Sequence, residues 1–113
     1  MLTLEALKNF GANTEEGLGR CMGNEALYIR LVGMLANETN FDRLKEAVDA
    51  GDLKTAFEAA HALKGVLGNL SLTSIFEPAS ELTELLRAEK DADYAAYVRE
   101  ILKKRDELFE LMK

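Results

Sequence analysis

The only histidine of the chain, His61, lies in a segment that combines an imidazole, a lysine and two glycines at helical spacing. The segment reads Ala60-His61-Ala62-Leu63-Lys64-Gly65-Val66-Leu67-Gly68-Asn69. A neutral imidazole is a competent nucleophile near neutral pH, because one ring nitrogen keeps a free lone pair. Lys64, one helical turn further on, can supply a positive charge to an anionic group on that ring. These residue types are compatible with a covalent phosphohistidine, since phosphoryl transfer needs mainly positioning and cationic stabilisation.

An apolar stripe on the predicted helix indicates which way the imidazole points. At 100° per residue, one face carries Leu53, Ala56, Ala60, Leu63, Leu67 and Leu70. His61 lies on the opposite side, in the sector that also holds Phe57, Lys64, Gly65 and Gly68. We therefore expect His61 to be exposed and the two glycines to keep the approach to it open, although each costs about 1 kcal/mol inside a helix. The alternative role of the two glycines is to allow close packing between helices. Phe57 is expected to be a partly exposed apolar contact for a docking partner.

The segment resembles the signature of histidine-containing phosphotransfer (Hpt) domains, which is His-x-Leu-Lys-Gly preceded by alanine on a helix. The matching residues are Ala60-His61-Ala62-Leu63-Lys64-Gly65, and the resemblance extends over residues 13–105. It implies that His61 accepts a phosphoryl group from an aspartate of a response-regulator receiver domain and passes it to another receiver. It also implies that Lys64 contacts the phosphoryl oxygens, that Gly65 and Gly68 leave the approach open, and that Arg87 is a basic residue near the site.

The same resemblance implies the partners, which are receiver domains and a hybrid sensor histidine kinase. We expect no cofactor on this chain, because it has no glycine-rich nucleotide site, and the Mg²⁺ for transfer is expected on the receiver. Three positions depart from the family pattern. Val66 and Leu67 stand where small or hydroxyl residues are common, and Ser71 stands where a glycine is common. These changes affect packing near the site but leave the nucleophile and its lysine in place.

Other functions fit the sequence less well. The main alternative is a helical module that docks receiver-like partners through the same face without being phosphorylated. A phosphohistidine phosphatase would need a second general base, and none is evident; Glu58 with Glu81 or Glu84 is a poor carboxylate pair, because acidic residues are common on helix surfaces. A single histidine and the lone Cys21 provide no metal site. We therefore predict a phosphoryl carrier without its own kinase activity or ATP site.

Capping and stop signals predict the helices that position this segment. Thr3 caps a short helix over residues 4–10, and a second short helix begins at residue 13 or 14 and ends at Gly23. Asn24 caps a third helix, whose predicted face carries Leu27, Leu31, Met34, Leu35 and Glu38, with Tyr28 and Val32 beside it. The pattern breaks at residues 37–40 and then resumes from Phe41 to Gly51, either in the same helix or in a separate one.

The second half of the chain has its own signals. Asp52 caps the histidine helix, and Ser74-x-x-Glu77 has the form of a capping box that places Pro78 in a first turn. If that helix instead begins before Ser74, Pro78 lies inside it and should bend it. A turn over residues 90–93 precedes the last helix, whose apolar face begins at Tyr94 and is interrupted late by Arg105.

The predicted fold is all-α. We expect an antiparallel up-down-up-down four-helix bundle with short N-terminal helices, as a single Hpt domain over residues 1–113 with its bundle core at about 24–112. The 113 residues carry a net charge of −6, which argues against nucleic acid and anionic membranes as partners. No run of 18 apolar residues occurs, and a lone cysteine fits a reducing compartment. We expect a cytoplasmic monomer.

Overall fold

The structure, a computed structural model, describes all 113 residues and contains seven α-helices, one 3₁₀ segment and no strand. The elements are α1 (Leu4–Phe10), α2 (Thr14–Arg20), α3 (Glu25–Gly33), η1 (Met34–Asn37), α4 (Asn40–Ala50), α5 (Leu53–Asn69), α6 (Thr73–Arg87) and α7 (Tyr94–Leu111). The predicted all-α class is confirmed. No helix combines the length and the apolar character needed to span a membrane.

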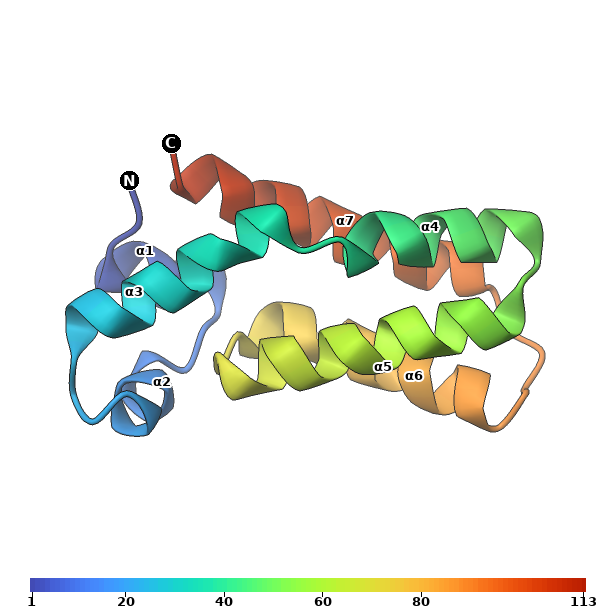
Figure 1. The fold of residues 1–113 in the computed structure, drawn as a ribbon, viewed down its shortest axis with the longest axis horizontal. Coiled ribbons are helices and arrows are strands. Elements are labelled where there is room, and N and C mark those ends of the chain that lie inside the picture. Colours follow the sequence, from blue (N-terminus) through green and yellow to red (C-terminus); the bar gives the residue numbers. More distant parts are fainter.

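Helices α4 to α7 form the antiparallel bundle. Helix α5 packs against α4 and α6, and α7 packs against the other sides of the same two helices. The connections are short, so successive helices run in opposite directions (Figure 1). Helix α3 continues the line of α4 beyond η1, and α1 and α2 lie at the same end of the molecule as α3 (Figure 1). The predicted up-down-up-down arrangement with short N-terminal helices is confirmed.

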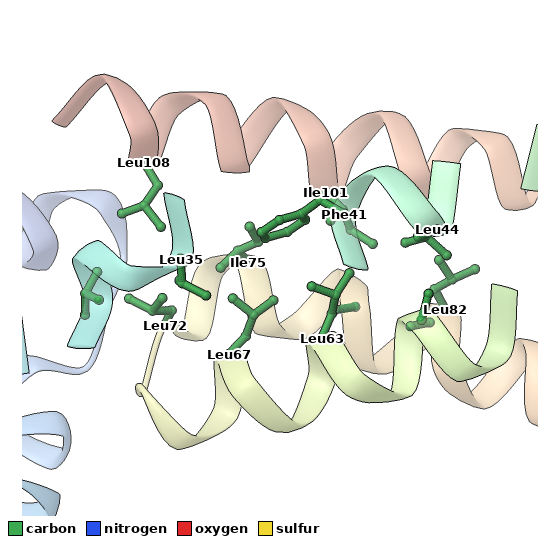
Figure 2. Close-up of a cluster of buried hydrophobic side chains, with 14 of the residues drawn as sticks. Leu35, Phe41, Leu44, Leu63, Leu67, Leu72, Ile75, Leu82, Ile101 and Leu108 are labelled. Carbon is green, nitrogen blue, oxygen red and sulfur yellow. The ribbon is translucent and has the colours of Figure 1, made fainter. Parts of the chain in front are cut away.

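The core lies between the four bundle helices. Side chains of α5 and α6 point toward those of α4 and α7, as Leu63, Ile75, Phe41 and Ile101 illustrate (Figure 2). The middle of the predicted apolar stripe on α5 is buried as expected. Its ends are not: Leu53 is 43% exposed and Leu70 is half-buried.

The buried face of the third helix is centred on residues that the sequence placed beside the predicted face. Tyr28, Val32 and Leu35 are buried, whereas Leu27 and Leu31 are half-buried and Met34 is 59% exposed. The cause is the packing of α2 against α3. Gly17 in α2 faces the Tyr28 ring, and the Tyr28 hydroxyl donates a hydrogen bond of 2.8 Å to the carbonyl of Leu70 at the end of α5. A contact with the far end of another helix thus selects the buried face.

The structure also shows where three helix boundaries lie: one that the sequence placed differently and two that it left open. Helix α2 ends at Arg20 rather than at Gly23, and α4 is separate from α3 because η1 and a bend lie between them. The predicted capping box is absent, since α6 begins at Thr73 without a side-chain cap. The hydroxyl of Ser74 instead donates to the carbonyl of Phe10 at 2.8 Å. Pro78 therefore lies inside α6, as in the second interpretation of the sequence.

Candidate functional site

His61 lies on the exposed side of α5, two residues before the buried Leu63. The helix begins after Asp52, whose side chain accepts a hydrogen bond of 3.2 Å from the backbone N–H of Thr55. This bonding from Thr55 holds the pKa of the Asp52 carboxyl below its usual value. The Phe57 ring stacks on the imidazole, with centroids 5.6 Å apart and planes inclined by 18°. The helix thus holds the histidine in solvent with one face against an aromatic ring.

Two residues of α6 extend the contacts that begin at the imidazole. The guanidinium carbon of Arg87 lies 5.1 Å from the Phe57 ring centroid. The Nε atom of Arg87 is 3.3 Å from one oxygen of Glu84, and the Nζ atom of Lys64 is 3.4 Å from the other. The chain of contacts that starts at His61 thus ends at Lys64, which is one turn from His61 on α5. We call His61, Phe57, Arg87, Glu84 and Lys64 the α5–α6 cluster.

The charge of Glu84 is shared between the two cations of this cluster. Desolvation raises the pKa of the Glu84 carboxyl, but the hydrogen bond from Lys64 and the charge of Arg87 outweigh it and lower the pKa overall. Glu84 is therefore ionised at neutral pH. The cluster then holds two positive charges and one negative charge beside the imidazole.

The two glycines of the motif have different surroundings. A Cβ atom at Gly65 would have no neighbour within 4 Å, so the surface there is open. A Cβ atom at Gly68 would lie 3.0 Å from Cε1 of Phe76 in α6. The absence of a side chain at Gly68 therefore lets α6 approach α5 closely, which is the alternative role that the sequence left open for this glycine.

A surface hollow of about 530 Å³ lies beside His61 toward the end of α5. Its walls include Lys64, Gly65 and Gly68 from α5, Phe76 from α6, and Arg20 from α2. Arg20 donates a hydrogen bond of 2.9 Å to the carbonyl of Gly68, which fixes α2 against the end of α5. The hollow is thus bounded partly by the N-terminal helices.

Comparison with known families shows which family the chain belongs to. The family model of the Hpt domain matches residues 34–110, which is more than half of the chain. The chain belongs to the Hpt domain family. Searches of curated proteins and of solved structures find no match. Phosphotransfer in His–Asp phosphorelays is the function of Hpt domains, and it applies to this chain at the level of the family.

The Hpt match covers η1 and the four bundle helices, so α1, α2 and α3 lie outside it. Arg20, Phe76 and Glu84 are among the residues near His61 that the sequence pattern did not indicate as part of the site. Arg20 is separated from Gly68 by 48 positions, and Glu84 from Lys64 by 20, so no local spacing rule connects them. No cluster of three or more His, Cys, Asp or Glu side chains is arranged to hold a metal ion.

Proposed function

We propose that this protein carries a phosphoryl group in a multistep His–Asp relay, accepting it on His61 from a receiver-domain aspartate and passing it to another receiver. The observation that carries the proposal is the exposed imidazole beside Lys64 and Gly65 within an Hpt domain. Exposure lets a partner reach the ring, and the lysine supplies a cation one helical turn away.

The chemistry requires only one nucleophile on this chain. The unprotonated ring nitrogen of His61 attacks phosphorus, and the bond between phosphorus and the aspartate oxygen breaks. The electron pair of that bond leaves with the receiver carboxylate, while the proton on the other ring nitrogen stays on the imidazole. Return transfer is the same step in reverse. Mg²⁺, if the step uses it, would be held by the receiver carboxylates.

The neighbouring residues have separate proposed roles. Lys64 would neutralise charge on the phosphoryl oxygens, and Arg87 would add a second cation from α6. Phe57 and Gly65 would contact the receiver, the first as an apolar surface and the second as a gap into which a loop fits. Gly68 would act on docking indirectly, by setting the spacing of α5 and α6. The proposed partners are receiver domains and a hybrid sensor histidine kinase.

The test is transfer from a phosphorylated receiver domain of the same organism. Wild-type protein should gain one acid-labile phosphoryl group, measured by intact mass at neutral pH, and His61→Gln should gain none. Because His61 is the only histidine, a phosphohistidine can form nowhere else. Circular dichroism should show that both proteins keep their helical content.

Two outcomes would contradict the proposal. Labelling that persists in His61→Gln would place the phosphoryl group on another residue. Binding to receivers without any transfer would instead support the docking module, which uses this face without chemistry.

A further inference from the structure

The α5–α6 cluster contains an anion where a phosphoryl acceptor would be expected to have cations only. Glu84 contacts both Lys64 and Arg87, at 3.4 and 3.3 Å. It is on α6, so it is fixed to a different helix from the histidine and the lysine. In the unphosphorylated protein, the ammonium group of Lys64 is therefore already paired.

Phosphorylation changes this balance of charge. Without the phosphoryl group, Lys64, Arg87 and Glu84 sum to one positive charge. A phosphoryl group on His61 adds roughly two negative charges at neutral pH. It would lie one helical turn from Lys64, so the phosphoryl oxygens and the Glu84 carboxylate would compete for the same ammonium group.

The observed geometry allows Lys64 to change partner. The side chains of Lys64 and Glu84 are 31% and 52% exposed, and ion pairs that are open to solvent are weak. The lysine stem is long and flexible, whereas Arg87 is held over the Phe57 ring. Arg87 can remain beside Glu84 after Lys64 has turned toward the phosphoryl group.

We propose that Glu84 is a positioning residue that competes with the phosphoryl group for Lys64 and so lowers the stability of phosphorylated His61. The inference rests on the proposed function of His61. Its consequence is that the carrier is loaded less completely but donates its phosphoryl group more readily. Lys64 exchanges its ion pair with Glu84 for one with the phosphoryl oxygens, and no covalent bond other than those of the phosphoryl transfer is made or broken.

The test uses phosphoramidate, a small phosphoryl donor that needs no receiver. Wild type, Glu84→Gln, Lys64→Ala and the double variant are equilibrated with it, and the ratio of phosphorylated to free His61 is measured by ³¹P NMR at neutral pH. Glu84→Gln should raise this ratio by about three- to tenfold at low salt, with a smaller effect at high salt. In the Lys64→Ala background, the same substitution should change the ratio less than about twofold, because the competition has been removed.

Glu100→Gln is the matched control. Glu100 is exposed on α7, forms no ion pair, and carries the same charge on a helix that packs against α4 and α6. It should leave the ratio unchanged. An unchanged ratio in Glu84→Gln, or an equal increase with and without Lys64, would overturn the role of Glu84 while leaving phosphorylation of His61 intact. A wild-type protein that takes no phosphoryl group would instead contradict the proposed function.

Discussion

At the scale of single residues, the site consists of one nucleophile and a small, nearly balanced set of charges. His61 stacks on Phe57, and the cations Lys64 and Arg87 share the carboxylate of Glu84. A neutral ring and a mobile cation are enough for phosphoryl transfer, because the receiver supplies the phosphoryl group. The contribution of each side chain should therefore appear in rates and equilibria rather than in folding.

Replacing Lys64 by alanine should slow transfer without unfolding the bundle. The variant loses a cation beside the transferring group, and the loss of one such electrostatic contact slows a reaction by at least about tenfold. Lys103→Ala, on an exposed position of α7, is the matched control and should transfer at the wild-type rate. The measurement is the single-turnover rate from a phosphorylated receiver, together with thermal unfolding. Equal rates for Lys64→Ala and wild type would remove the assigned role.

Much of the site was predictable at this scale because the motif is local. The exposure of His61 follows from the apolar stripe on one helix, and the half-buried position of Phe57 follows from the same pattern. Glu84 and Arg20 were not predictable, because their contacts depend on how α6 and α2 are rotated against α5. The packing role of Gly68 could not be decided from the sequence for the same reason, since only the position of Phe76 shows what its missing side chain permits.

At the scale of elements, the N-terminal helices form hydrogen bonds with the turn that connects α5 and α6. The backbone N–H of Asn13 donates to the carbonyl of Ser71 at 2.8 Å, and the hydroxyl of Ser71 donates to Glu16 at 2.8 Å. Ser71 has a φ of 56°, a left-handed conformation that favours glycine, and its bond to Glu16 compensates for part of that cost. Contacts from α2 thus fix the end of the helix that carries the histidine.

Replacing Gly17 by alanine should destabilise the protein, although alanine favours helices. Its Cβ atom would lie 2.5 Å from two atoms of the buried Tyr28 ring, and such overpacking costs about 1–3 kcal/mol. Gly19→Ala in the same helix is the matched control, because a Cβ atom there would have no neighbour within 4 Å. It should be neutral or slightly stabilising. Urea unfolding measures both changes, and equal stabilities of the two variants would contradict this packing.

Helix boundaries were predictable where the signal lies within the helix itself. Thr3, Asn24 and Asp52 each accept a backbone N–H three residues ahead, as their sequence positions predict. The start of α6 was not predictable, because the hydroxyl of Ser74 bonds to Phe10 instead of capping its own helix. Caps act over one turn, whereas the choice between a cap and a distant carbonyl is made by tertiary packing.

At the scale of the whole molecule, one core joins all the helices. The buried residues include Leu7 of α1 and Val32 of α3 as well as those of the four bundle helices. Tyr28 is the polar link in this core, since its hydroxyl connects α3 to the carbonyl of Leu70. The stability of the entire chain should therefore respond to the ionisation of this phenol.

Stability should fall at alkaline pH partly because of Tyr28. Burial raises the pKa of its hydroxyl, and the nearby Cys21 and Glu16 raise it further, so the folded state favours the neutral phenol. A raised pKa in the folded state gives stability that is complete below the unfolded value of about 10 and is lost as the pH rises through the folded value. Tyr28→Phe should be less stable at neutral pH and should lose less stability above about pH 10. Parallel pH profiles of unfolding free energy for the two proteins would contradict this assignment.

The stacking of Phe57 on His61 also makes the site visible to spectroscopy. With a single histidine in the chain, the imidazole carbon-bound protons give one pair of signals in a proton NMR spectrum, and these need no isotope labelling to assign. The aromatic ring current of Phe57, whose centroid is 5.6 Å away, shifts these signals away from their free-solution positions. Any event that turns the imidazole, such as phosphorylation or receiver docking, moves it relative to that ring. The protein thus contains its own reporter of the state of its reactive residue.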